Sequence, residues 1–354
     1  MNLDDLDRAL LDRIQRNFPI EPRPFEALAR ELGTDEATIM NQVRQLQSGG
    51  VVRQIGPVFD LHRLGYTSTL CAAKISADAI DNVASHINAD PEVTHNYLRD
   101  AEFNIWFTLV APSQERIDEI LEEIRKLAGV EDVISLPADR TFKINVHFAT
   151  GDAPVQDINK QEQKTGTDTL LGSFKRVSVP AFRDPPATIT TFSDRDIALI
   201  RALQAPFPIV EQPWLEIAER AGMTEDEVIT SVREWLGSGV IRRFGARVKH
   251  HAIGYTANGM SVWDVPADRV EFAGRYIASL PEVSHCYTRP RAPQWPYNLY
   301  AMIHGTHEEQ VLALARQLAQ RLNIQRWEVL FSTRELKKSA PVYFSELPNR
   351  GGSF

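Results

Sequence analysis

The stretch GVVRQIGPVFDLHRLGY, residues 50–66, returns later in the chain as GVIRRFGARVKHHAIGY, residues 239–255. The two copies align without a gap, so that Gly56 matches Gly245 and each copy ends in Gly-Tyr. The match continues upstream through an FPI motif in each copy. Self-similarity of this extent predicts a tandem of two homologous halves.

Each half begins with three segments of helical periodicity. In the first half, Leu6, Leu10 and Ile14 form one apolar stripe, and Thr34 is expected to cap the third helix. A Gly-Gly pair ends that helix, and VVRQIGPVFD then predicts a two-stranded wing. The pattern is typical of a winged helix-turn-helix, and its occurrence in both copies supports the assignment.

The second part of each half alternates strand and helix patterns in the order β-α-β-β-α-β, which predicts a ferredoxin-like domain. The expected fold class is therefore α+β, a tandem duplication in which each half is a winged helix-turn-helix followed by a ferredoxin-like domain. The expected boundaries are 1–62 and 193–251 for the winged helix-turn-helix domains, 63–148 and 252–340 for the ferredoxin-like domains, 149–192 for a linker and 341–354 for a tail.

The composition bounds the class of protein. Hydrophobic residues make up 43% of the 354 residues and charged residues 24%, which is typical of a globular chain. No run reaches the roughly 18 apolar residues of a membrane span, and the acidic N-terminus lacks the features of a signal peptide. Cys71 and Cys286 form no disulfide framework or thiolate metal site. We therefore expect a cytoplasmic protein.

A His-X-Tyr-X-Arg triplet occurs in each half. It is His95, Tyr97 and Arg99 in the first half, and the second half repeats it at residues 285, 287 and 289. Alternate residues of a strand share a face, and the helix-covered face of such a sheet should be apolar. The triplets are therefore expected on the open face, as part of a ligand pocket. The alternative is a sheet interface between subunits, where Tyr and Trp are also enriched.

Nucleic-acid binding is disfavoured by the charges. The net charge is −8, and the expected recognition helices carry one cation each, Arg44 and Arg233. Glu225, Asp226 and Glu227 lead the second of these helices and would repel phosphate. The expected wings are also unequal, because the second is strongly basic and the first is not. This asymmetry favours one ligand site over paired DNA contacts.

The arrangement resembles the Lrp/AsnC family of amino-acid-responsive regulators over almost all of both halves. The stretches HNYLRDAEFNIWFTL, RRFGARVKHHAIGYTANGMSVW and HCYTRP with WPYNLYAMIHG are more specifically similar to siroheme decarboxylase. In that family two related subunits pair, and here they look fused. The resemblance implies a carbon-carbon lyase that removes CO2 from two acetate side chains of siroheme, giving didecarboxysiroheme for haem d1 or alternative haem biosynthesis. It also implies that the reaction needs no separate cofactor, since the iron belongs to the substrate.

Siroheme is a flat iron macrocycle with eight carboxylates, so its site needs aromatic walls, several Arg or Lys donors and a ligand for iron. Catalytic roles are expected for His95, His285, Tyr97 and Tyr287, with a Tyr as acid and a His as iron ligand or proton donor. His250 and His251 are rival iron ligands. The expected substrate-binding residues are Arg53, Arg99, Asn104, Trp106, Arg242, Arg243, Arg247, Lys249, His250, His251, Arg289, Trp295, Tyr297 and Asn298.

Two other functions fit the same pattern. One is a tandem Lrp/AsnC-type transcription regulator with a small-molecule or haem effector, and the other is a non-catalytic porphyrin carrier or sensor. The expected partners are siroheme itself, a second copy of the chain and homologous decarboxylase chains. Neither DNA nor a membrane is expected as a partner.

Overall fold

The structure is a computed structural model that describes residues 3–144, 189–248 and 257–345. The predicted linker therefore lies outside the described residues, except for residues 189–192. The elements of the first half are α1 (Asp5–Arg16), α2 (Pro24–Leu32), α3 (Glu36–Ser48), β1 (Val52–Phe59), β2 (Thr67–Ile75), α4 (Ile80–Ala89), β3 (Val93–Arg99), β4 (Ile105–Ala111), α5 (Gln114–Arg125), β5 (Val130–Pro137) and β6 (Arg140–Ile144).

The second half repeats this order, which confirms the duplication. Its elements are α6 (Asp194–Gln204), α7 (Pro213–Ala221), α8 (Glu225–Ser238), β7 (Ile241–Val248), β8 (Ala257–Trp263), α9 (Val270–Ala278), β9 (Val283–Thr288), β10 (Leu299–Gly305), α10 (Glu308–Arg321) and β11 (Trp327–Lys338). None of the helices in the described ranges is long and apolar enough to cross a membrane.

The start of α3 differs from the sequence prediction by one residue. Asp35, and not Thr34, is the N-cap, and its carboxylate accepts a hydrogen bond from the backbone N–H of Thr38 at 2.9 Å. A carboxylate at this position also interacts favourably with the positive end of the helix dipole. The equivalent position in the second half is Thr224, which caps α8 with a capping box. The cap position is thus shared while its chemistry differs.

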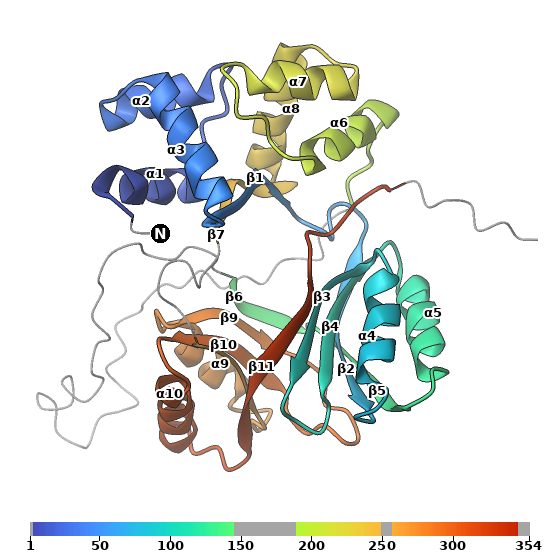
Figure 1. The fold of residues 1–354 in the computed structure, drawn as a ribbon. Helices are drawn as coiled ribbons and strands as arrows, with labels where there is room; N and C mark the ends of the chain where they lie inside the picture. Colours follow the sequence, from blue (N-terminus) through green and yellow to red (C-terminus); the bar gives the residue numbers. More distant parts are fainter. Residues whose placement is uncertain (1–2, 145–188, 249–256, 346–354) are drawn as a thin grey trace, which may run out of the picture.

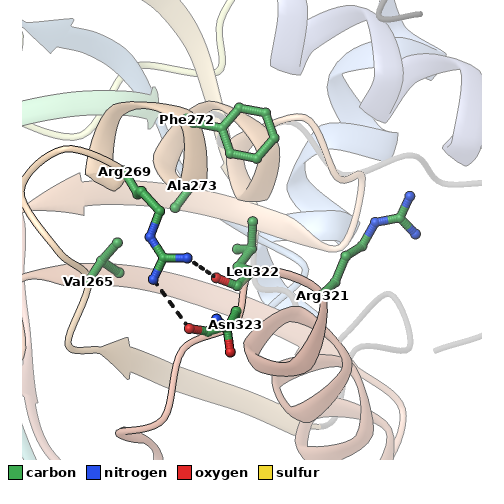
Figure 2. Close-up of a pocket in the computed structure, with 7 residues that line it drawn as sticks. All are labelled: Val265, Arg269, Phe272, Ala273, Arg321, Leu322 and Asn323. Atoms are coloured by element: carbon green, nitrogen blue, oxygen red, sulfur yellow. Dashed lines mark hydrogen bonds between the residues drawn. The ribbon is translucent and has the colours of Figure 1, made fainter. Parts of the chain in front are cut away.

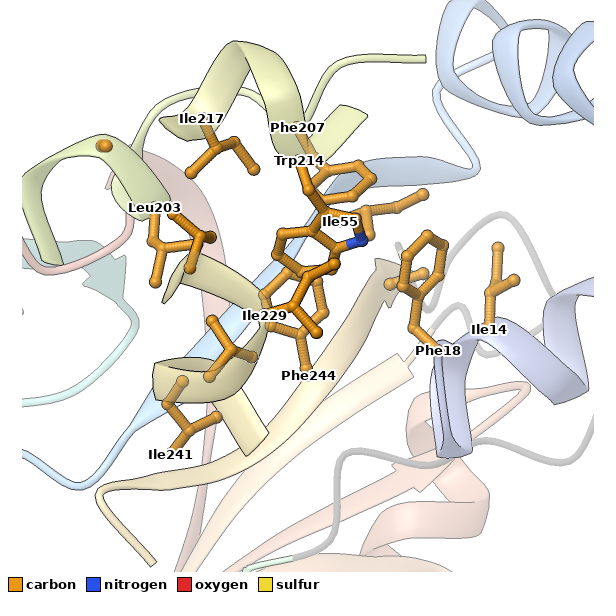
Figure 3. Packing of buried hydrophobic residues seen from close by; sticks show 14 of the residues in the cluster. Ile14, Phe18, Ile55, Leu203, Phe207, Trp214, Ile217, Ile229, Ile241 and Phe244 are labelled. Carbon is orange, nitrogen blue, oxygen red and sulfur yellow. The ribbon is translucent and has the colours of Figure 1, made fainter. Parts of the chain in front are cut away.

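The two helix-turn-helix units share one hydrophobic core (Figure 3). Phe18 and Phe207, from the repeated FPI motif, pack edge to face with their ring centroids 5.2 Å apart. Phe244 of β7 lies 5.7 Å from Phe207 and 5.4 Å from Trp214. Because these rings come from both halves, neither unit can bury its apolar surface without the other.

The predicted two-stranded wing is wrong. Each half supplies a single strand, and β1 pairs with β7 in antiparallel register, with Gly56 opposite Gly245. The glycine allows the close approach of this ribbon to the helical layer, since a Cβ on Gly245 would collide with the backbone carbonyl of Ile14. The wing is therefore a joint structure, and it ties the halves together.

The ferredoxin-like domains are also joined. Among the described residues, nine strands form one sheet in the order β5-β2-β4-β3-β11-β8-β10-β9-β6. The first part of β11 pairs with β8 of its own half, and from Ser332 onwards it pairs with β3 of the other half. The single closing strand predicted for the first half is divided after Pro137, so that β5 stays in its own half while β6 pairs with β9.

Helices cover one face of each part of this sheet, α4 and α5 in the first half and α9 and α10 in the second, and the helix-turn-helix layer lies at one end (Figure 1). The remaining faces contribute to an apolar cluster with members from both halves, including Trp106 and Leu136 from one and Met260 and Tyr300 from the other. The faces without helices therefore pack against each other.

The segment after β11 returns to the helix-turn-helix layer. Tyr343 is buried in the shared helical core, and its backbone N–H donates to Oε1 of Gln204 at 2.6 Å. The next residue, Phe344, donates its N–H to the hydroxyl of Tyr66 at 2.6 Å. The described part of the predicted tail, residues 341–345, is thus docked against residues of both halves.

Candidate active site

The first triplet lies on the face of β3 that the helices leave uncovered. Asn96, between His95 and Tyr97, points towards the helices, because its Nδ2 donates to Oδ1 of Asn88 in α4 at 3.0 Å. By alternation, His95, Tyr97 and Arg99 share the opposite face. The placement predicted from the sequence is confirmed for this strand.

The second triplet has the same placement on β9. Cys286, between His285 and Tyr287, points towards α9 and donates its thiol to the carbonyl of Gly274 at 3.6 Å. His285, Tyr287 and Arg289 therefore occupy the face away from the helices. The two triplets are related by the duplication, and both look towards the space that the halves share.

Each triplet forms a ladder of stacked groups. The rings of His95 and Tyr97 have centroids 6.4 Å apart and planes 24° apart, and the guanidinium of Arg99 lies 5.6 Å from the Tyr97 ring. In the second triplet the corresponding values are 6.1 Å, 28° and 5.2 Å. Stacking of Arg on Tyr adds cation–π attraction and restricts the rotamers of both. The ladders present an imidazole, a phenol and a guanidinium in a fixed order.

The two arginines are anchored on the opposite half. Arg99 donates to the carbonyl of Leu330 at 2.6 Å, and Arg289 donates to that of Leu136. Both side chains have a buried Nε that meets no partner among the described residues, and neither forms an ion pair with a carboxylate of those residues. Burial lowers the pKa of Arg99 to about 10, so it stays cationic at neutral pH. The charge of Asp139 reaches Arg289 without forming an ion pair with it. A buried cation that lacks an ion-pair partner favours the binding of an anionic ligand.

His95 marks the point where several elements converge. Burial, and after it the positive charges of Lys338, Arg53 and Arg247 together with His285, lower its pKa to about 4. These groups come from β11, from both strands of the wing and from the second triplet. The two triplets therefore belong to one basic region beneath the wing.

The protonation states separate the imidazoles from the phenols. Burial lowers the pKa of His285 to about 4, with a further contribution from Lys143 of β6. Burial raises the pKa of Tyr97 to about 12, helped by Glu335, and burial raises that of Tyr287 to about 12. At neutral pH the imidazoles are neutral and the phenols are protonated. The histidines can offer a nitrogen lone pair, and the tyrosines can donate a proton.

The wing arginines are used in different ways. Arg242 donates to Asp60 at 2.8 Å. Burial raises the pKa of Asp60, but the hydrogen bond and charge of Arg242 outweigh burial and hold it below its ordinary value. Arg247 donates to the carbonyl of Pro57 at 3.0 Å across the ribbon, while its charge still reaches His95. The charge of Arg53 helps to lower the pKa of His95.

Arg243 is held by backbone carbonyls through one of its terminal nitrogens. Its Nη1 donates to the carbonyl of Gln15 in α1 and, at 3.3 Å, to the carbonyl of Ala246. Burial lowers its pKa, with a further contribution from Arg247. Nη1 thus fixes the first helix against the wing, and a substrate contact through the other nitrogens of Arg243 stays a prediction.

The two asparagines predicted to bind substrate are backbone clamps. Asn104 accepts from the N–H of Ile75 at 3.0 Å and donates to the carbonyl of the same residue at 2.7 Å. Asn298 makes the same pair of bonds to Val265, at 2.8 and 3.0 Å. Each amide thus uses one donor and one acceptor on the backbone, and a substrate contact through its second N–H stays a prediction.

The predicted aromatic walls are an interface between the halves. The rings of Trp106 and Trp295 lie 5.1 Å apart at 62°, and Tyr297 lies 4.8 Å from Trp295. The polar ends of these rings are also satisfied, because Trp106 donates to the carbonyl of Phe103 at 2.7 Å and Tyr297 to Glu328 at 2.6 Å. The longer loop of the second half therefore packs on the first half, and a substrate-binding role for these aromatic residues stays a prediction.

Lys249, His250 and His251 lie outside the described residues. The two rival iron ligands, His250 and His251, are therefore not placed.

Two polar residues near the triplets were missed in the sequence. His304 of β10 is buried and contacts Ser284, which in turn contacts His285. Tyr343, in the predicted tail, lies close enough to Arg247 and Arg242 for their charges to affect it. One signal for His304 was available in the sequence. It is a polar residue at the position where the first copy has the apolar Val110.

One described cavity lies elsewhere, between α9 and the end of α10 (Figure 2). Its volume is about 150 Å³, below the roughly 300 Å³ at which sites for small-molecule ligands begin. Arg269 lines it and donates to the carbonyls of Leu322 and Asn323, both at 3.3 Å. None of the residues that line it belongs to either triplet, and it is too small for a macrocycle.

Comparisons with known proteins agree first on the class. A family model for the AsnC-like ligand binding domain matches residues 63–143 and 252–337. A second model, for the siroheme decarboxylase NirDL-like HTH domain, matches residues 7–53 and 196–242. Each half of the chain thus contains one NirDL-like HTH domain and one AsnC-like ligand binding domain.

Similar full-length proteins narrow the class to a family. The siroheme decarboxylase of Hydrogenobacter thermophilus is 36% identical, over 95% of this chain and 94% of that protein. The siroheme decarboxylase NirDL subunit of Paracoccus denitrificans is also 36% identical, over 94% and 96%. A crystal structure of the siroheme decarboxylase NirDL in complex with an iron-uroporphyrin III analogue matches with a TM-score of 0.70 at 32% identity, over 97% of this chain and 95% of that one. This chain belongs to the siroheme decarboxylase family.

Proposed function

We propose that this chain decarboxylates siroheme, and that it removes CO2 from two acetate side chains to give didecarboxysiroheme. The observation that carries the proposal is the pair of His-Tyr-Arg ladders, which face one basic region and hold two buried guanidinium groups without carboxylate partners among the described residues. The relatives named as siroheme decarboxylases, and the relative bound to an iron porphyrin analogue, support the same substrate class.

The reaction is a carboxy-lyase reaction that needs one proton for each CO2. An acetate side chain, –CH2–COO⁻, takes up H⁺ and loses CO2, and a –CH3 group remains on the macrocycle. The electrons of the broken carbon–carbon bond must pass through the macrocycle before the methylene is protonated. The substrate supplies this electron sink together with its iron, so we propose that no separate cofactor takes part.

The charges of the site suggest the roles. Tyr97 and Tyr287 are protonated at neutral pH and are the proposed general acids. His95 and His285 are neutral and are the proposed ligands for the substrate iron. An arginine that bound the reacting carboxylate would stabilise the ground state and slow the reaction. We therefore assign Arg99 and Arg289 to carboxylates that remain on the product.

The alternative function, transcription regulation, requires free cations on the recognition helices. Instead, Arg44 of α3 donates to the carbonyl of Ile209 at 2.6 Å, and Arg233 of α8 donates to that of Ile20 at 2.6 Å. Each cation thus bridges to the other half. Acidic residues occupy the first turn of α8. These contacts favour a scaffold role for the helical layer, and we propose that DNA is not a partner.

We further propose that the chain works in the cytoplasm, as an oligomer or with homologous decarboxylase chains, and on the haem d1 route. The word subunit in the name of the Paracoccus relative supports an assembly of several chains, and the fused pair of halves is our reason for preferring the haem d1 route.

The decisive experiment is anaerobic incubation of the purified chain with siroheme, followed by mass spectrometry of the extracted pigment. Loss of one and then two CO2 units is the expected result. An unchanged substrate with a shifted Soret band would instead indicate a carrier or sensor. The assay is repeated with added homologous chains, and failure in both settings overturns the proposal. A gel shift over a salt series tests the regulator alternative.

A further inference from the structure

A chain of buried polar groups runs behind the second histidine. Nδ1 of His285 contacts Oγ of Ser284 at 2.7 Å, and the same Oγ contacts Nε2 of His304 at 2.6 Å. On its other side, Nδ1 of His304 is hydrogen bonded to Oδ1 of Asn258. Ser284 and His304 are buried, and His304 lies directly opposite Asn258 in the pairing of β10 with β8.

The acceptor at the far end sets the direction of the chain. An amide oxygen can only accept, so Nδ1 of His304 carries the proton and, in a ring with a single N–H, Nε2 is the acceptor. Ser284 then donates its only hydroxyl proton to His304 and accepts from Nδ1–H of His285. Nε2 of His285 is left as the nitrogen with a free lone pair.

The first half reaches the same state by a shorter route. Nδ1 of His95 contacts Oγ1 of Thr94 at 3.0 Å, and that hydroxyl donates to the backbone carbonyl of Thr108 at 3.3 Å. A carbonyl can only accept, so the direction is fixed by the backbone itself. The residue that corresponds to His304 is Val110, which packs in the helical core and makes no such bond.

We propose that His304 is a positioning residue for the decarboxylation, and that through Ser284 it holds His285 in the tautomer whose Nε2 lone pair binds the substrate iron. The proposal rests on siroheme as the substrate. It predicts that the second half depends on side chains for a function that the backbone performs in the first half. Outer partners of a ligating histidine commonly change affinity or activity by about 10- to 100-fold.

The test uses His304→Val, which installs the residue found at the equivalent position of the first half, and Ser284→Ala. His304→Val removes the acceptor, and Ser284→Ala removes the hydroxyl that connects it to His285. In either variant the tautomer of His285 is no longer fixed. We expect kcat on siroheme to fall by about 10- to 100-fold, with a shifted visible spectrum of bound siroheme and little change in KM. Ser284→Thr keeps the hydroxyl and, like Thr94, should recover most of the loss.

The matched control is His307→Val, the same substitution at an exposed residue of the following loop that makes no capping hydrogen bond. It should leave both kcat and the spectrum unchanged. Melting temperatures of all variants, and the siroheme affinity of His304→Val, separate misfolding from mispositioning.

Two failures are distinguishable. Wild-type turnover and an unshifted spectrum in both His304→Val and Ser284→Ala would overturn the positioning role and leave the decarboxylase function intact. Wild-type protein that binds siroheme without releasing CO2 would overturn the function, and a shifted spectrum in the two variants would then still support the role of His304.

Discussion

The two halves of this chain began as copies, and they now differ most where they meet the proposed substrate. Both keep a His-Tyr-Arg ladder of nearly the same geometry. The supports differ, because His95 rests on a hydroxyl bound to the backbone and His285 rests on a relay of side chains. The surroundings differ as well, since the longer aromatic loop of the second half packs on the first. Duplication preserved the ladders while their settings diverged.

The largest effect is expected from removal of the proposed acids. Tyr97→Phe and Tyr287→Phe each delete one phenol and leave its ring stacked, and general acid catalysis contributes about 10²- to 10⁴-fold. If each half protonates one acetate product, each variant should accumulate siroheme that has lost a single CO2. Mass spectrometry of the pigment over time measures this. Full double decarboxylation at the wild-type rate in both variants would rule out the tyrosines as acids.

Removal of the buried cations should be the next largest effect. Arg99→Met and Arg289→Met each delete a charged hydrogen-bond donor, which is worth about 1.5–3 kcal/mol, or about 10- to 100-fold in siroheme affinity. Arg243→Met is the control, because that arginine is bound to the backbone of α1 and its loss should reduce stability without changing affinity. Spectroscopic titration and thermal melting separate the two. Equal affinity losses in all three would contradict the assignment.

The two histidines should also determine part of the pH dependence of stability. The pKa of each is about 4 in the folded chain, below the ordinary value of about 6.5. Between these values the unfolded chain binds more protons, so stability is complete above about pH 6.5 and falls as the pH decreases towards 4. His95→Gln and His285→Gln should each flatten this decrease, and the double variant should flatten it most. Urea unfolding between pH 4 and 7 tests this, and unchanged slopes would count against it.

The smallest effect concerns the caps of the two equivalent helices. Asp35→Ala in the first half and Thr224→Ala in the second should each reduce the free energy of unfolding by about 1 kcal/mol. Thr34→Ala, one residue earlier, should have a much smaller effect because Thr34 is not the cap. Denaturant melts of the three variants measure the difference. A larger loss for Thr34→Ala than for Asp35→Ala would show that the cap is misplaced.

Periodicity and self-similarity were sufficient to predict the duplicated fold and the face on which the triplets lie. Both depend on local rules, namely strand alternation and helical spacing, that act within a few residues. The joint wing and the crossing of β6 and β11 were not predictable in this way. They depend on which edge of one half meets which edge of the other, and a strand carries no local sign of a partner in another domain.

The site was predicted less completely than the fold. Residue type indicated the His-Tyr-Arg ladders, but it could not separate polar groups that face a ligand from those that the backbone has already engaged. Asn104 and Arg243 carry donors suited to carboxylates, and the structure shows one donor nitrogen of each bonded to a backbone carbonyl. His304 was missed because a single histidine in an apolar strand usually has a structural role.

The crossing of β11 has a consequence for synthesis on the ribosome. Arg99 and the carbonyl of Leu330 to which it donates are 231 positions apart. The edge of β3 therefore has no strand partner until nearly the whole protein has been made. Contacts of such long range slow folding, and an unpaired strand edge is prone to aggregation. Until β11 is made, the nascent first half therefore exposes a strand edge on which copies of the chain can associate.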